Sequence, residues 1–241
     1  NSINFEKYEN LYFFPSFHID YENLKTTDQA STALKKQEGT YFDTSIMYRL
    51  NYDVRNSPYQ ATNGYRSVFA QEIPITSDTY ELMNSYEFTK YHQYFNDKMA
   101  SFSFHAKSIN SLAGEDVRIS KRLYVPGRKL RGFEKGMVGP IENNDYVGGN
   151  YLSTINFSTT LPNFLPDQQN TDFKFFIDVA NLWGVDYSDP LDDNGTIRSS
   201  TGIAVDWFTP IGPLSFSLSQ PLTKKSTDKT ETFRFNLGTT F

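Results

Sequence analysis

The chain has 241 residues, of which 38% are hydrophobic and 16% aromatic, enough for one large β domain but unlike a typical water-soluble core. Its formal net charge is −5, and its basic residues are scattered apart from one central segment and Lys224–Lys225, which argues against a nucleic-acid-binding protein. Cysteine is absent, so the sequence offers neither a disulfide framework nor a thiol nucleophile.

The hydropathy of the sequence limits which membrane segments and which signal peptide the chain can contain. No run of 18 apolar residues occurs, which excludes a transmembrane helix. Membrane-spanning strands remain possible, because such strands show lipid only every second residue. Residues 1–10 have neither a charged n-region nor an apolar h-region, so we expect either that a signal peptide was removed or that the chain begins part-way through a longer protein.

Alternation of apolar and polar residues predicts about ten β-strands of roughly ten residues each. Polar or turn-forming segments separate them, for example residues 23–39 and 53–64. The predicted strands cover residues 11–21, 40–51, 65–73, 79–91, 98–107, 149–161, 172–182, 199–208, 214–220 and 230–241.

The strand lengths and the loops between them predict an all-β fold, an antiparallel transmembrane β-barrel. Strands of about ten residues cross a bilayer when tilted. The gaps before Thr40, within 108–147, at 184–198 and at 221–229 tend to be long, whereas most of those between them are shorter. Long loops on one side and short turns on the other are typical of such barrels. The alternative is a soluble β-sandwich, which shows the same alternation but buries its apolar faces.

The central loop, residues 108–147, is the longest part of the chain without alternation. Its glycines and prolines forbid a regular helix or strand, while its apolar residues argue against disorder. We therefore expect a folded plug that docks elsewhere on the protein. The residues behind this expectation, all within 125–140, are Gly127, Gly132, Gly136, Gly139, Pro126, Pro140, Arg128, Lys129, Arg131, Lys135, Leu130, Phe133, Met137 and Val138.

Motifs in and after this loop resemble those of a known family. The sequence Leu130-Arg131-Gly132-Phe133, followed by GP and VGGN, resembles the sixth extracellular loop of the BamA-type outer-membrane protein assembly barrels of the bacterial surface antigen superfamily. The similarity covers nearly the whole chain in order and spacing. Its other parts are YDVRN at 52–56, TNG at 62–64, FID at 176–178, WG at 183–184, DWFTPIGPL at 206–214 and a last strand ending at Phe241.

The resemblance implies a sixteen-stranded barrel preceded by periplasmic POTRA domains. Residues 1–241 would then be the C-terminal portion of the barrel domain, with about ten of the sixteen strands, the long Arg-Gly-Phe loop at 108–147 and no POTRA domain. The first strands of the family barrel would be missing from this chain.

The function implied by the resemblance is an assembly factor that folds and inserts β-barrel proteins into the bacterial outer membrane. Its partners would be unfolded outer-membrane protein clients, outer-membrane lipid and assembly lipoproteins that act through the absent POTRA domains, with no nucleic acid. The alternative is an outer-membrane secretion pore of the two-partner (TpsB-like) type, which shares the barrel and the arginine loop.

The resemblance also implies how the loop docks. Arg131 would reach back into the barrel and contact Phe176 and Asp178 on the lumen-facing side of their strand, where a guanidinium can bind a carboxylate with two hydrogen bonds. Gly132 would allow a sharp turn, and Phe133 would be an apolar anchor. The family often has a glutamate one strand earlier, at a place equivalent to a position near Ser158. The alternatives are a solvated loop arginine and an ordinary lumen carboxylate.

The last strand resembles the signal by which outer-membrane barrels are recognised for insertion. An apolar ladder with an aromatic terminus can pair edge to edge with a receptor strand. The alternative is simply the last lipid-facing strand. In the family the last strand also closes weakly against the first strand of the barrel, and Gly238 fits such a weak closure. The residues concerned are Phe233, Phe235, Leu237, Gly238 and Phe241.

Enzymatic chemistry finds little support in the sequence. His18, His92 and His105 are widely separated and lie in no nucleophile motif, and His105 is expected to line the lumen. Residues 186–195 fail the calcium-loop template and are expected to form a solvated surface hairpin. We therefore expect no enzyme activity, no cofactor and no metal site.

Overall fold

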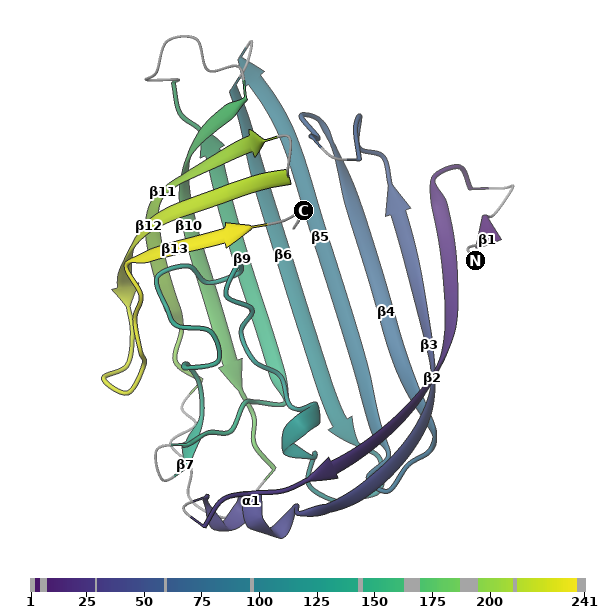
Figure 1. Ribbon diagram of the computed structural model, residues 1–241. Helices are drawn as coiled ribbons and strands as arrows, with labels where there is room; N and C mark the ends of the chain where they lie inside the picture. Colours follow the sequence, from purple (N-terminus) through teal and green to yellow (C-terminus); the bar gives the residue numbers. More distant parts are fainter. Residues whose placement is uncertain are drawn as a thin grey trace.

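The protein is described here by a computed structural model, which covers residues 3–4, 8–28, 30–58, 60–95, 98–142, 145–162, 170–186, 195–209 and 212–237. Within these residues one curved antiparallel sheet of 11 strands forms most of the molecule, and a small two-stranded hairpin lies apart from it (Figure 1). The strands of the sheet follow one another in chain order.

All ten predicted strands are present, which confirms the all-β fold class. They are β2 (Leu11–Leu24), β3 (Gly39–Asp53), β4 (Gly64–Thr76), β5 (Glu81–Phe95), β6 (Lys98–Ser111), β9 (Tyr151–Thr160), β10 (Thr171–Trp183), β11 (Arg198–Thr209), β12 (Gly212–Thr223) and β13 (Phe233–Leu237). The remaining elements are β1 (Ile3–Asn4), the hairpin β7 (Ile141–Glu142) and β8 (Asp145–Tyr146), the helix α1 (Thr32–Lys36) and a 3-10 turn (Ile119–Lys121).

Two local features differ from the sequence-based expectation. Helix α1 lies in the segment expected to be loop, where the Ser31 side chain caps it by accepting a hydrogen bond from the Leu34 N–H (3.3 Å). Strand β6 continues to Ser111, so the central loop occupies residues 112–150. The sequence pattern did not predict this extension, because the outer face of β6 ends in polar residues. One of them, Asn110, accepts a hydrogen bond from the Tyr151 hydroxyl (2.6 Å).

No helix among the described residues is long and apolar enough to span a membrane.

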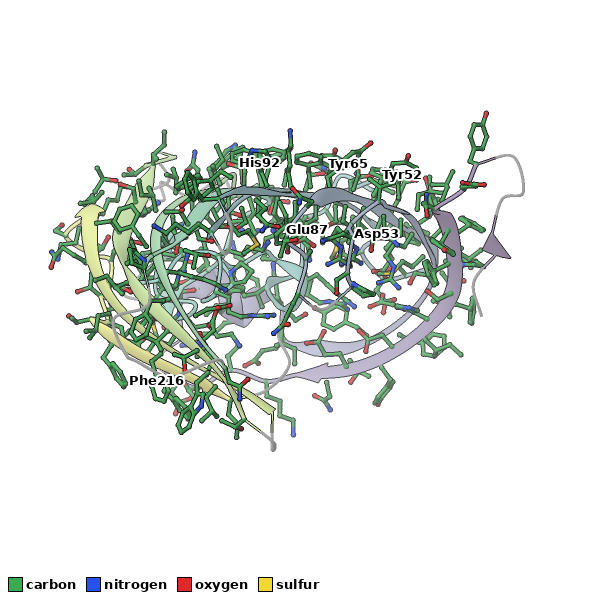
Figure 2. The ribbon with its side chains drawn as sticks, turned by 90° about the horizontal axis from the view of Figure 1, so that it is seen from above. Tyr52, Asp53, Tyr65, Glu87, His92 and Phe216 are labelled. Atoms are coloured by element: carbon green, nitrogen blue, oxygen red, sulfur yellow. The ribbon has the colours of Figure 1, made fainter. Side chains whose placement is uncertain are left out.

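The two faces of the sheet differ in polarity. In Figure 2, Tyr52, Tyr65 and His92 point away from the hollow of the sheet, whereas Asp53 and Glu87 point into it. Large apolar side chains remain exposed on the outer face, as a membrane-spanning sheet requires and a water-soluble sandwich forbids. Examples, with their exposed fractions, are Ile19 (66%), Ile203 (49%), Leu218 (59%) and Leu237 (63%).

A chain of polar side chains crosses the outer face at one level. The Tyr48 hydroxyl donates to the Gln71 side-chain oxygen (3.0 Å), and the Gln71 amide donates to the Asn84 oxygen (2.6 Å). The Asn84 amide then donates to the Ser108 hydroxyl (3.4 Å). These four residues, which we call the outer polar ladder, link strands β3 to β6.

The hydrophobic core lies between the central loop and the inner wall of the sheet. It joins loop residues to β6, β9 and β10 rather than one sheet to another. Its loop members are Val117, Leu123, Val125, Leu130, Phe133 and Val138, and its wall members are Ile109, Leu152, Ala180 and Leu182.

The two edges of the sheet are β1 and β13. Among the described residues, five of β13 pair with β12, from Leu237 opposite Leu214 to Phe233 opposite Leu218. On the other side of the sheet, β2 pairs with β3 through 14 residues. Residues 238–241, which follow β13, lie outside the described residues.

Candidate functional site: the docked central loop

The central loop folds into the hollow of the sheet. In Figure 1 it lies inside the curve, against β9 to β13, with its 3-10 turn toward the end that carries α1. Inside the loop Leu123 and Gly149 form an antiparallel bridge, with backbone hydrogen bonds of 2.9 Å in both directions. Burial raises the pKa of the Tyr124 hydroxyl, which donates to the Tyr146 carbonyl (3.2 Å). The loop is thus a folded unit.

Arg131 binds Asp178 on the inner wall of β10. Its Nε and Nη2 each lie 2.7 Å from a different oxygen of the Asp178 carboxylate, and its backbone N–H donates to the same carboxylate (3.1 Å). Its guanidinium carbon also lies 3.4 Å from the centre of the Phe176 ring. Asp178 is fully buried, and this arginine supplies the opposite charge beside it. Arg131 and Asp178 therefore form a bidentate salt bridge, with a cation–π contact between Arg131 and Phe176 beside it.

Asn156, on the neighbouring strand β9, completes this contact. Its side-chain amide donates to Asp178 Oδ1 (2.8 Å) and to the Lys129 carbonyl of the loop (2.8 Å). Ser158, near the place that the family resemblance gives to a glutamate, forms a hydroxyl hydrogen bond with Ser101 (2.7 Å). Asn156 rather than Ser158 lies directly opposite Asp178 in the strand register. A neutral amide thus occupies the place nearest the arginine site on β9.

Gly132 and Phe133 carry the loop away from this contact. Gly132 has φ +89°, a conformation that residues with a Cβ rarely adopt, and a Cβ there would lie 3.2 Å from Ser200 Cβ and from Ser219 Cβ. Phe133 is buried and forms a bridge with Thr230 in the segment between β12 and β13. The Glu231 N–H donates to the Gly132 carbonyl (3.1 Å). The loop therefore pairs with the segment that leads into β13.

A second anchor, which the sequence did not reveal, holds the start of the loop. Arg118 is buried, and its guanidinium binds Asp43 of β3 through Nη2 and lies 3.3 Å from Glu22 of β2 through Nε. The guanidinium also lies 4.2 Å from the centre of the Tyr41 ring. Nearby, Lys121 Nζ lies 2.6 Å from Asp20 on β2. Basic loop residues thus meet acidic wall residues at this end too.

Arg122 joins the loop to the segment after β10. Its Nη2 binds Asp186 Oδ1, and the Val117 N–H donates to Asp186 Oδ2 (2.8 Å). Asp186, the first residue of the predicted surface hairpin, is exposed and binds this buried arginine. Residues 187–194 of the predicted hairpin lie outside the described residues.

The terminal-strand residues take their expected faces as far as the structure describes them. Phe233, Phe235 and Leu237 are exposed on the outer face of β13. Gly238 and Phe241 lie outside the described residues.

The histidines are dispersed over both faces of the sheet. His105 is buried in the inner wall, His18 lies 3.1 Å from the Ser16 hydroxyl, and His92 points outward (Figure 2). Within the described part of the chain, no three His, Cys, Asp or Glu side chains group closely enough to hold a metal ion.

Three curated relatives resemble this sequence. The outer membrane protein assembly factor BamA of Neorickettsia risticii is 23% identical over 246 residues, which cover 100% of this chain and 33% of that protein. BamA of Neisseria meningitidis is 30% identical over 145 residues, 46% of this chain and 17% of that protein. The human sorting and assembly machinery component 50 homolog is 27% identical over 169 residues, 66% of this chain and 36% of that protein. The chain thus spans about a third or less of these bacterial relatives, which are named as assembly factors rather than enzymes.

A solved structure has the same fold. It is the crystal structure of BamA from Haemophilus ducreyi lacking POTRA domains 1–3, which matches with a TM-score of 0.84 and 24% identity over 96% of this chain and 51% of that one. The family described as the Omp85 superfamily domain matches residues 3–241. The chain therefore belongs to the Omp85 superfamily and has the fold of a BamA-type transmembrane β-barrel of the outer membrane.

Proposed function

We propose that this chain belongs to an assembly factor that folds and inserts β-barrel proteins into the bacterial outer membrane. Its residues would supply the C-terminal portion of the barrel domain, and the activity would require no catalytic chemistry and no cofactor. The names of its relatives support this activity, since BamA of two bacteria carries the description outer membrane protein assembly factor.

The observation that carries the proposal is the docked loop beside the edge strand β13. The contact of Arg131 with Asp178 holds the loop inside the hollow. The adjoining strand β13 has five described pairs with β12 and carries Phe233, Phe235 and Leu237 on its outer face. A strand with free backbone groups and apolar side chains toward lipid can template a further strand by edge-to-edge pairing.

The proposed partners follow from the same reading. Unfolded outer-membrane protein clients would be the substrates, and outer-membrane lipid would cover the apolar outer face. Assembly lipoproteins would act through POTRA domains. The loop motif of Arg131, Gly132 and Phe133 would keep the lumen filled while clients are handled at the edge.

The test uses the protein in its full encoded length, reconstituted in liposomes. An unfolded client barrel is added, and its folded fraction is followed by the change in gel mobility between boiled and unboiled samples. We expect client folding to be faster than in empty liposomes, with little ion conductance. A steady conductance without faster client folding would contradict the proposal and favour the secretion pore.

A further inference from the structure

We infer that Arg234 is a positioning residue that ties the docked loop to the terminal strand β13, so that loop and strand move together. Arg234 lies on the inner face of β13, between the outward-facing Phe233 and Phe235. The inference deepens the proposed function and depends on it for its biological meaning, because that function places the working edge at β13.

The contacts of Arg234 reach two separate points of the loop. Its Nη1 donates to the Gly127 carbonyl, and its Nη2 donates to the Phe133 carbonyl (2.5 Å). The same guanidinium binds the Glu231 carboxylate through Nε (3.1 Å) and Nη2 (2.7 Å). One side chain of the edge strand thereby bridges the two sides of the turn that presents Arg131.

The loop is shaped to receive this side chain. A Cβ at Gly127 would lie 2.5 Å from Arg234 Nη1 and 3.1 Å from its Cζ, so a larger residue there would push the guanidinium aside. The Arg234 side chain is 11% exposed, which keeps its hydrogen bonds from being weakened by competing water. Two carbonyls at a fixed separation suit a planar, forked donor better than the single ammonium of a lysine.

Backbone pairing strengthens the same link. The Glu134 N–H donates to the Lys229 carbonyl (3.0 Å), and the Lys229 N–H donates to the Met137 carbonyl (3.1 Å). With the bridge between Phe133 and Thr230, the loop forms a short ladder along the segment before β13. Side-chain and backbone hydrogen bonds thus link the loop to β13 and to the segment before it, in addition to the pairing of β13 with β12.

Hydrogen exchange of the full encoded chain in lipid nanodiscs tests the coupling. We expect Arg234→Gln to speed amide exchange at least about tenfold both in β13 and in loop residues 133–137, because charge-assisted hydrogen bonds to two loop carbonyls are lost. Arg234→Lys should give an intermediate increase, and Gly127→Ala should reproduce the effect from the loop side. The matched control is Arg66→Gln, which removes an inner-face arginine whose Nε donates to Asn51 (2.8 Å) on the neighbouring strand.

Coupling is reciprocal, so the loop must also act on the strand. Asp178→Asn, which frees Arg131, should speed exchange in β13 although Asp178 lies on β10. Faster exchange confined to β13 in Arg234→Gln, or an unchanged β13 in Asp178→Asn, would overturn the inference. The client-folding rate of the wild type in the same nanodiscs separates the two proposals. If exchange in the loop and in β13 is coupled but clients do not fold, the assembly function is overturned and the role of Arg234 is supported. If clients fold but exchange is uncoupled, the assembly function is supported and the role of Arg234 is overturned.

Discussion

A single buried carboxylate organises the loop at the scale of residues. Asp178 accepts hydrogen bonds from the Arg131 backbone and side chain and from Asn156, so its charge is compensated within a fully buried site. Removing one partner of such a pair costs more than forming the pair gains, because the other charge is left without solvent. The pair therefore specifies where the loop sits.

We expect Asp178→Arg to release the loop and Asp178→Asn to weaken it by about 2–3 kcal/mol, because the charge-assisted contact is lost. Limited proteolysis of residues 125–140 measures the release. Asp172→Asn is the control, since Asp172 lies on the same face of β10 with its side chain 46% exposed and 3.9 Å from Lys174. Unchanged protease resistance in Asp178→Arg would contradict the role of the contact.

Substitution of Gly132 would cause both backbone strain and crowding by neighbouring side chains. Substitution of a second glycine, Gly114, would cause the strain alone. Gly132→Ala should lower stability by about 1–3 kcal/mol from its positive φ, and further from the approach to Ser200 and Ser219. Gly114→Ala meets a similar φ (+79°) with no atom within 4 Å, so it should show the backbone cost alone. The midpoint of heat-induced gel shift measures both, and an equal loss would exclude crowding.

At the scale of elements, the loop is held at separate points along its length. Arg118 at its start binds β2 and β3, Arg131 at its centre binds β10, and Phe133 pairs with the segment before β13. Basic side chains of the loop meet acidic side chains of the wall at the first two points. The loop therefore braces strands that lie far apart in the sheet.

Replacing Arg118 should destabilise the protein more than replacing its neighbour Lys121. Arg118→Gln should destabilise the end of the protein that carries α1 by about 3 kcal/mol, since it leaves Asp43 without its buried cation. Lys121→Gln should cost at most about 1 kcal/mol, because the Lys121–Asp20 pair is partly exposed. Hydrogen exchange of residues 117–123 and of β2 compares the two variants. Equal effects would mean that Arg118 is no more important than a surface cation.

The outer polar ladder ties four strands together where lipid is expected. Gln71→Leu removes two of its three hydrogen bonds and should lower stability by about 1 kcal/mol, because the Tyr48 hydroxyl and the Asn84 oxygen would then face lipid. Ser67→Ala on the same face breaks one hydrogen bond to Tyr86 and is the milder control. A raised melting midpoint for Gln71→Leu would show that lipid contact outweighs the ladder.

Local sequence pattern explains which parts of the fold and site could be predicted. Alternation gave all ten strands, because each strand shows one apolar face to the outside. It could not place Asn156 rather than Ser158 beside Asp178, since both point inward and only strand register separates them. It also missed the pairing of Arg118 with Asp43, because the two residues are 75 positions apart and meet only when the loop enters the hollow.

At the scale of the whole molecule, the apolar side chains form two separate groups, one exposed on the outer face of the sheet and one buried in the hydrophobic core. The outer face presents its apolar side chains to the surroundings, whereas the described core is formed by loop against wall. The loop therefore supplies more than half of the described hydrophobic core as well as lying in the hollow of the sheet. Its removal should cost stability in addition to opening a path.

We expect deletion of residues 125–140 to raise ion conductance and also to lower the heat-shift midpoint, because Leu130 and Phe133 would leave the core. Phe133→Ala alone should cost about 3–5 kcal/mol. Phe235→Ala is the control, since this side chain is 49% exposed on the outer face. Raised conductance with an unchanged midpoint would mean that the loop merely blocks the lumen.

The span of the loop's contacts sets an order for folding. Gly127 and Arg234 are 107 residues apart, and Phe133 pairs with Thr230 near the end of the described chain. Strands β2 to β6 can pair as neighbours as soon as they emerge, since each adjoins the next in sequence. The loop, made midway, must wait for β13 before its last contacts exist. Its core residues are covered earlier, once β9 and β10 supply Leu152, Ala180 and Leu182, so the chain is most vulnerable to aggregation between the completion of β6 and the arrival of β10.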